Sequence, residues 1–132
     1  SQLQHNEEIK GGARVTHGKG GAWEICSMLS GFPDHINALS CEWRMKCPSG
    51  RPGKREGKYQ GVKGRVSSLN EILPLERWTG KCIVDNMDFK LKLHILRDVV
   101  GYLDMSKVPE NITVEIVDTI DKSCVDLERE IY

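Results

Sequence analysis

The chain has 132 residues, which is the size of one ordinary domain and too small for two. Apolar residues make up 39% and charged residues 29%, a composition typical of folded rather than disordered proteins. Nineteen basic residues balance nineteen acidic ones, and this zero net charge excludes a uniformly basic nucleic-acid binder. No apolar run reaches the roughly 18 residues of a transmembrane helix, and no signal peptide is recognisable.

The cysteines indicate free thiols rather than a disulfide framework. Their number is odd, they are widely spaced and none forms a CxxC pair, so we expect a reducing compartment. On one extended strand, Cys41 and Cys47 would lie about 20 Å apart and could not share a zinc ion. We therefore expect no metal and no cofactor. The five cysteines are Cys26, Cys41, Cys47, Cys82 and Cys124.

The chain begins with a polar segment. Residues 1–12 are predicted to form a flexible arm, because only Leu3 and Ile9 offer apolar area before the Gly11-Gly12 pair. Residues 13–17 are predicted to form a short strand, and residues 17–21 a turn. Residues 22–29 are predicted to form a helix, because apolar side chains recur at helical spacing. The apolar positions of that helix are Ala22, Ile25, Cys26 and Leu29.

A long strand is predicted over residues 36–47. Apolar and polar residues alternate there, so one face would be buried and the other solvated. Residues 48–58 are a loop with two prolines and three glycines, and residues 59–67 are predicted to form a strand weakened by glycine. The apolar face of the long strand comprises Leu39, Cys41, Trp43, Met45 and Cys47.

The second half contains two further alternating segments. Residues 89–96 and 112–117 are predicted to form strands. Residues 98–105 are predicted to form a short helix, and residues 120–131 a C-terminal one; residues 82–84 are predicted to form a short edge strand. The sequence therefore predicts an α+β fold, with a largely antiparallel sheet and two or three helices packed on one side, in a single globular domain over residues 13–132.

Local motifs offer little support for catalysis. In the glycine-rich residues 12–20, five residues separate Gly12 from Gly18, and Gly20 follows the lysine. A phosphate loop needs four residues between its glycines and a Ser or Thr after the lysine. No GxSxG motif and no cysteine nucleophile turn is present. His94 lies among lysines on a strand face and is interpreted as part of a solvated basic surface. A small cytosolic enzyme with Cys26 or Cys82 as nucleophile is the third hypothesis.

Charge is distributed asymmetrically. Residues 44–65 hold eight basic residues and one acid, a balance of +7, whereas residues 103–132 hold eight acids and three bases, a balance of −5. Both stretches are compatible with plain solvated faces. Alternatively, the basic stretch contacts phosphate of lipid headgroups or nucleic acid, and the oppositely charged ends dock head to tail. The basic residues are Arg44, Lys46, Arg51, Lys54, Arg55, Lys58, Lys63 and Arg65.

The order of elements resembles the globular domain of rhabdovirus matrix proteins. The likeness is best from Gly64 to Asp98, where a Gly-Arg start leads through residues 72–75 (ILPL) to residues 90–98 (KLKLHILRD). The strongly basic N-terminal tail of that family is absent here. The resemblance implies a viral structural protein without an active site, which binds membrane, condenses the nucleocapsid and self-associates.

The leading hypothesis is accordingly a non-enzymatic matrix-like protein for virion assembly and budding. Its expected partners are copies of itself, the viral nucleocapsid, an anionic membrane surface and RNA, and Leu3 and Ile9 are the expected self-association anchors. Its expected location is the virion and the host cytoplasm at the membrane periphery, with the host nucleus as a further site. The alternative is a small viral nucleic-acid-binding protein of the movement or silencing-suppressor type, which would use residues 44–65.

Overall fold

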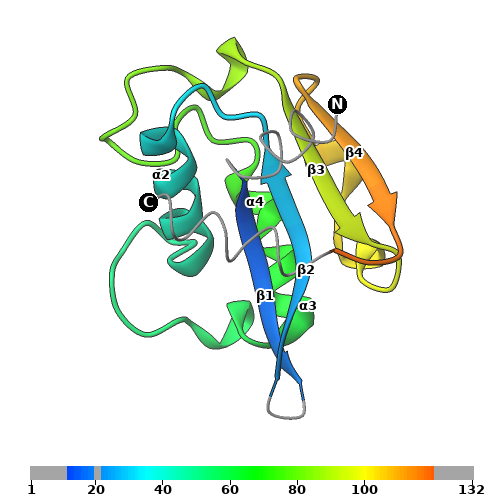
Figure 1. Ribbon diagram of the computed structural model, residues 1–132. Coiled ribbons are helices and arrows are strands. Elements are labelled where there is room, and N and C mark those ends of the chain that lie inside the picture. Colours follow the sequence, from blue (N-terminus) through cyan, green and yellow to red (C-terminus); the bar gives the residue numbers. More distant parts are fainter. Residues whose placement is uncertain (1–11, 20–21, 121–132) are drawn as a thin grey trace.

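A computed structural model describes residues 12–19 and 22–120 of the chain. Four strands form one sheet in the order β1-β2-β3-β4 (Figure 1). The strands are β1 (Ala13–Lys19), β2 (Ala22–Ser30), β3 (Leu91–Leu96) and β4 (Ile112–Val117). The β1–β2 and β2–β3 pairs are antiparallel, and β3 and β4 run parallel. The predicted α+β class with a largely antiparallel sheet is confirmed.

Among the described residues, three α-helices accompany the sheet. They are α2 (His35–Lys46), α3 (Gly61–Ser67) and α4 (Leu69–Ile72). In Figure 1, α2 flanks the β1 edge, far from β4, while α3 and α4 lie behind β1 and β2. In this view, the long connection from α2 to α3 passes below α2, and the long connection from α4 to β3 passes above it. This arrangement brings β1, α2 and α3 together at one edge of the sheet.

The prediction of a helix over residues 22–29 is wrong, because this segment is β2. The register between β1 and β2 shifts between Val15 and Thr16, and Cys26 is the extra residue on β2. A bulge of this kind changes which face the following side chains occupy. Ile25 and Met28 consequently pack together in one small cluster, while Cys26 joins the main core. The bulge thus gives this strand apolar residues at the three-residue spacing of a helix, which is why the segment was predicted to be helical.

The prediction of a strand over residues 36–47 is also wrong, because this segment is the helix α2. Asp34 caps its start, accepting a hydrogen bond from the backbone N–H of Asn37 at 2.8 Å. Its core-facing residues are Ala38, Cys41 and Met45, at the i, i+3, i+7 spacing of one helix face. Apolar residues also lie on the opposite face, so the sequence satisfied both a period of two and a helical period.

Smaller differences concern short segments. Residues 59–67 form no strand but the turn Gly57–Tyr59 followed by α3, and residues 82–84 lie in an irregular connection. Residues 98–105 contain only the 3-10 turn Val100–Tyr102 and the first residue of another. The strand predicted over residues 112–117 is confirmed as β4. The strand predicted over residues 13–17 extends to Lys19, and the strand predicted over residues 89–96 begins only at Leu91. Residues 1–11 of the arm predicted over 1–12, and residues 121–131 of the helix predicted over 120–131, lie outside the described residues.

The core lies between the sheet and the helices. Leu29, Leu93 and Ile95 supply its sheet side, and Trp78 lies fully buried at its centre. The Trp78 ring meets Phe32 edge-on, with centroids 6.3 Å apart. The burial predicted for Met45 is confirmed. Leu91 and Leu93 on β3 are also buried, and Phe89 is half-buried. The burial predicted for Trp43 and Leu39 is wrong, because helical geometry places both on the exposed face of α2.

Among the described residues, no helix is long and apolar enough to cross a membrane.

Candidate functional site

A small, strongly charged cavity lies where β1, α2 and α3 meet. Its volume is about 60 Å³, which holds a few water molecules or an ion but not a nucleotide. Four cationic side chains and one carboxylate line it, giving a local charge of +3. These residues are Arg14, Glu42, Lys46, Arg55 and Arg65. We call this group the Glu42 cluster.

The position of Glu42 follows from how α2 begins. Gly31 ends β2 with φ +102°, and an added Cβ would lie 2.7 Å from the Lys90 carbonyl oxygen. Only glycine fits this close approach and left-handed conformation. The chain then turns through Pro33 to Asp34, which caps the N-terminus of α2. The buried residues of α2 pack into the core and fix the orientation of the helix. Glu42, in the middle of this helix, is thereby held toward β1.

Arg14 is the direct partner of Glu42. The Nη1 atom of Arg14 donates to Oε2 of Glu42 at 3.2 Å. The Arg14 side chain is only 7% exposed and the Glu42 side chain 20%, so the pair is largely shielded from water. Lys46 lies one helical turn beyond Glu42, with its Nζ at 3.9 Å from Oε1 and its side chain exposed. The carboxylate is thus held between a buried and a solvated cation.

Two further arginines complete the cationic wall. Arg55 donates from Nη1 to the Met45 carbonyl oxygen at 3.0 Å, and Arg65 donates from Nη1 to the Thr16 carbonyl oxygen at 2.6 Å. Burial lowers the pKa of the Arg55 guanidinium, and the nearby Arg65 lowers it further. Both side chains line the same cavity. Such a cluster attracts anions.

The described residues contain no group of three or more His, Cys, Asp or Glu side chains arranged to hold a metal ion. A single carboxylate can still hold Mg²⁺ jointly with substrate phosphates, since Mg²⁺ retains several water ligands. Glu42 is the only acidic residue among the described residues that line the cavity. It is therefore the only carboxylate of the Glu42 cluster that fits such a role.

The structure divides the eight predicted phosphate-contacting residues into two groups. Arg44, Arg55 and Arg65 direct their guanidinium groups at backbone carbonyls. Arg44 in particular bridges the Pro48 and Trp78 carbonyls and stabilises the turn after α2. The other five side chains are all exposed along the segment from α2 to α3. These five, the exposed basic arm, are Lys46, Arg51, Lys54, Lys58 and Lys63.

Sequence reasoning missed Arg14 and Glu42. The alternating pattern places Glu42 on the solvated face of a strand, and no motif singles out Arg14. Two signals for a helix over residues 35–46 were present in the sequence: the capping residue Asp34 and the four-residue spacing of Glu42 and Lys46. A helix in this position includes Glu42 in its interior. The pairing with Arg14 spans 28 residues and has no local signal.

The described candidates Cys26, Cys82 and His94 are not among the residues that line the cavity of the Glu42 cluster. Cys26 and Cys82 are both buried in the core, and burial raises the pKa of the Cys26 thiol, which opposes a nucleophilic role. His94 lies on β3, with Nε2 at 3.5 Å from Oε2 of Glu115 on β4. Leu3 and Ile9, the predicted self-association anchors, lie outside the described residues.

Comparison with curated proteins connects the chain to one group of enzymes. Over 46 residues it is 46% identical to the structure-specific endonuclease subunit SLX1 homolog of Leishmania major, a match that covers 35% of this chain and 6% of that protein. It is 35% identical over 79 residues to the SLX1 homolog of Cryptosporidium parvum, covering 58% of this chain and 19% of that protein. It is 34% identical over 84 residues to the structure-specific endonuclease subunit slx1 of Schizosaccharomyces japonicus, a match that covers 58% of this chain and 30% of that protein. No family model matches the chain.

These relatives correct the functional expectations. The rhabdovirus matrix resemblance is wrong, because the relatives are named endonuclease subunits and come from cellular organisms. The virion location, the viral nucleocapsid, membrane and self-assembly partners, and the viral nucleic-acid-binding alternative are wrong for the same reason. The expectation of a non-enzymatic protein is contradicted by the same names. The chain spans less than a third of the length of each of these three relatives.

Proposed function

We propose that this chain contributes the carboxylate and cationic surface of an endonuclease that hydrolyses phosphodiester bonds in structured nucleic acid. The observation that carries the proposal is the Glu42 cluster, in which one shielded carboxylate lies among four cations. The similarity to structure-specific endonuclease subunits supports the same class of reaction. Matrix-type binding would need no such carboxylate within a basic cavity.

Hydrolysis of a phosphodiester requires water to attack phosphorus and an alkoxide to leave. The water oxygen forms the new P–O bond and releases a proton to solvent, the bond to the leaving oxygen breaks, and that oxygen takes up a proton from solvent. Cations that neutralise the charge developing on phosphate oxygens supply much of the catalysis. In this chain Arg14 orients Glu42, and Glu42 is placed to hold an attacking water or a Mg²⁺ ion at the cavity.

The substrate must approach the cavity from its rim, because the cavity is too small for a nucleotide. Lys46 lies on this rim and is exposed, and it begins the exposed basic arm. Lysine and arginine in such an arm neutralise phosphates without reading base edges. We therefore assign positioning of the nucleic-acid strand to the exposed basic arm, and the hydrolysis chemistry to the Glu42 cluster.

The proposal is tested by cleavage assays with the full chain. Fluorescently labelled DNA flaps, hairpins and linear duplexes are incubated with Mg²⁺ and resolved on denaturing gels. Glu42→Gln removes the charge but keeps the shape, and it is expected to reduce cleavage at least about a hundredfold, as loss of key charge-stabilising groups does. Binding of the same DNA, measured by fluorescence anisotropy without Mg²⁺, should remain within about threefold of wild type.

Glu110→Gln is the matched control, since Glu110 is exposed and lies outside the cavity lining. It should cleave like wild type. Equal cleavage by Glu42→Gln and Glu110→Gln would remove Glu42 from the chemistry. Replacing Arg51, Lys54 and Lys58 by Ala should instead weaken binding. The slope of log affinity against log salt should become shallower by about 0.9 for each phosphate that the variant no longer neutralises.

A further inference from the structure

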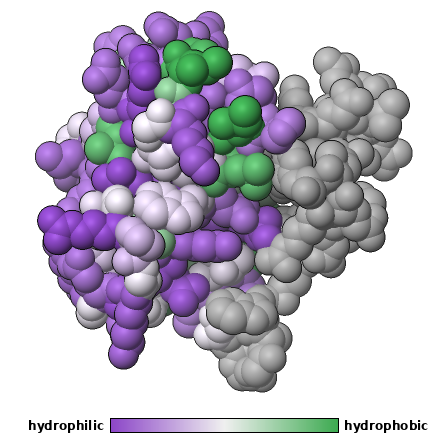
Figure 2. All heavy atoms as spheres, turned by 90° about the vertical axis from the view of Figure 1, so that its left-hand side faces the viewer, coloured by the Kyte–Doolittle hydropathy of each residue, from purple (hydrophilic) through white to green (hydrophobic). Residues whose placement is uncertain are grey.

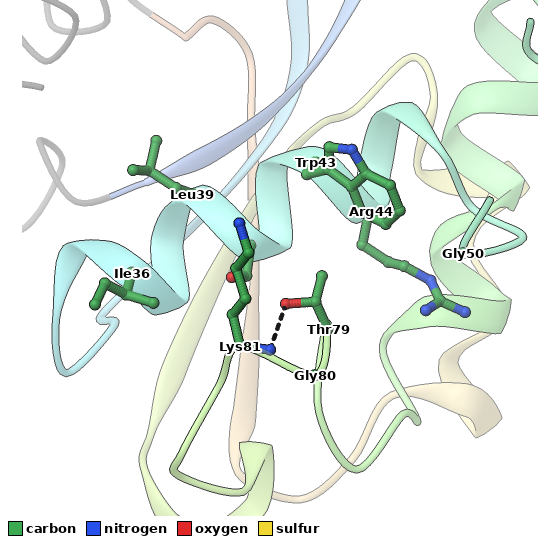
Figure 3. A pocket seen from close by; sticks show the side chains of 9 residues that line it. Ile36, Leu39, Trp43, Arg44, Gly50, Thr79, Gly80 and Lys81 are labelled. Carbon is green, nitrogen blue, oxygen red and sulfur yellow. Dashed lines mark hydrogen bonds between the residues drawn. The ribbon is translucent and has the colours of Figure 1, made fainter. Parts of the chain in front are cut away.

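An open apolar groove lies along the face of α2 that points away from the core. Three large apolar side chains are exposed there: Ile36 at 51%, Leu39 at 45% and Trp43 at 36%. Figure 3 shows α2 forming one wall of the groove and the Thr79–Lys81 turn lying opposite it. The groove has a volume of about 730 Å³. It is distinct from the Glu42 cluster, with which it shares no lining residue.

The spacing of these side chains is that of a recognition stripe. Ile36, Leu39 and Trp43 occupy positions i, i+3 and i+7, so they form a continuous line about 10 Å long on one side of the helix. Single exposed apolar residues are ordinary, whereas a contiguous set beside a groove marks an interaction surface. In Figure 2, which views the molecule from the α2 side, apolar patches interrupt an otherwise hydrophilic face.

Hydrogen bonds hold residues in both walls of the groove. Arg44 is anchored to the Pro48 and Trp78 carbonyls, and Gly50 allows this packing, because a Cβ there would lie 2.9 Å from the Arg44 guanidinium. In the opposite turn, the Lys81 backbone N–H donates to Thr79 Oγ1 at 3.3 Å (Figure 3). The groove is thus preformed on both sides, which reduces the entropy cost of binding.

The charge of the groove selects the chemistry of its occupant. Arg44 and Lys81 are the charged residues of the lining, and no Asp or Glu is among its nine described residues. An apolar floor with a cationic rim complements a helix whose apolar stripe is flanked by carboxylates. Trp and Arg are also the residue types that most often dominate binding energy at interfaces.

We infer that this groove is a docking site for an acidic amphipathic helix of a partner protein. The apolar face of that helix packs against Ile36, Leu39 and Trp43, and its acidic flank faces Arg44 and Lys81. This inference does not depend on the nuclease activity, because the groove and the Glu42 cluster lie on different faces of α2.

The probe is a synthetic 18-residue helical peptide with Leu at i, i+3, i+4 and i+7 spacing and Glu at the flanking positions. A matched peptide carries Lys in place of Glu, and a third carries a central Pro that breaks the helix. Binding is followed by the indole N–H resonance of Trp43, assigned with Trp43→Phe. The acidic peptide should bind with a Kd below about 100 μM and shift this resonance, and both matched peptides should bind at least about tenfold more weakly.

Substitutions in the chain locate the binding. Leu39→Asp and Lys81→Glu should each weaken the acidic peptide at least about tenfold. Met105→Asp, at a 57% exposed apolar side chain outside the groove lining, should leave it unchanged. Equal binding of the Glu and Lys peptides, no binding of the acidic peptide at about 1 mM, or insensitivity to Leu39→Asp would overturn the inference. A concentration-dependent dimer in sedimentation that Leu39→Asp abolishes would also overturn it, because the groove would then join two copies of the chain.

Discussion

The Arg14–Glu42 pair should be a strongly coupled ion pair, and a double-mutant cycle measures that coupling. At 3.2 Å and an effective dielectric constant of about 20, the Coulomb attraction is about 5 kcal/mol before desolvation is subtracted. Exposed pairs yield only about 0.2–1 kcal/mol, and breaking fully buried pairs costs about 3–5 kcal/mol. With side chains 7% and 20% exposed, this pair lies between the two cases.

The cycle uses Arg14→Met, Glu42→Gln and the double variant. Met keeps the apolar stem of arginine, and Gln keeps the shape of glutamate. We expect Glu42→Gln to lower the free energy of unfolding by about 2 kcal/mol, because Arg14 remains buried with a weaker acceptor. The coupling energy should be about 1–2 kcal/mol.

Urea unfolding at pH 7, followed by circular dichroism, gives the four free energies. The slope against denaturant should be equal in all four proteins, which shows that the unfolded state is unchanged. A coupling energy below about 0.3 kcal/mol would refute the reasoning, because the pair would then behave like an exposed one. The same measurement shows whether Glu42→Gln remains folded in the cleavage assay, so that a loss of activity is assigned to chemistry rather than to unfolding.

Three further outcomes follow from the fold. Burial, and secondarily Cys82, raises the pKa of the Cys41 thiol well above 9.0, so this thiol stays protonated in the folded chain where it would ionise in the unfolded chain. The free energy of unfolding should therefore fall as the pH rises above about 9. In Cys41→Ala this fall should be less steep, by at most about 1.4 kcal/mol per pH unit. Gly31→Ala should destabilise the chain by more than about 1 kcal/mol in urea, whereas Gly53→Ala, which meets no neighbour but shares a positive φ, should cost less. Trp78→Ala should cost about 3–5 kcal/mol by the same assay, and a value near zero would show that Trp78 is not at the centre of the core.

Strands with one buried face could be predicted from the sequence. In β3, Leu91, Leu93 and Ile95 are buried and alternate with Lys92 and His94, so the period of two was unambiguous. The α+β class followed from such segments together with helical patterns elsewhere. The asymmetry of charge was likewise visible, because it depends only on the order of charged residues along the chain.

The central helix and strand could not be distinguished locally. In α2, buried Cys41 and Met45 and exposed Leu39 and Trp43 are all apolar, and together they alternate as a strand would. In β2, the bulge at Cys26 gave the strand a helical spacing. Each local pattern fitted two structures, and packing against the rest of the core decided between them.

The candidate site depends entirely on tertiary structure. Composition and order along the chain determined that residues 44–65 would be basic and that the domain would be α+β. Only the fold decided that Arg14 reaches Glu42 across 28 residues, and that Arg55 and Arg65 turn inward to backbone carbonyls. A long-range ion pair has no periodic signature, because its two partners are brought together by the packing of α2 against β1 and not by their spacing in the sequence.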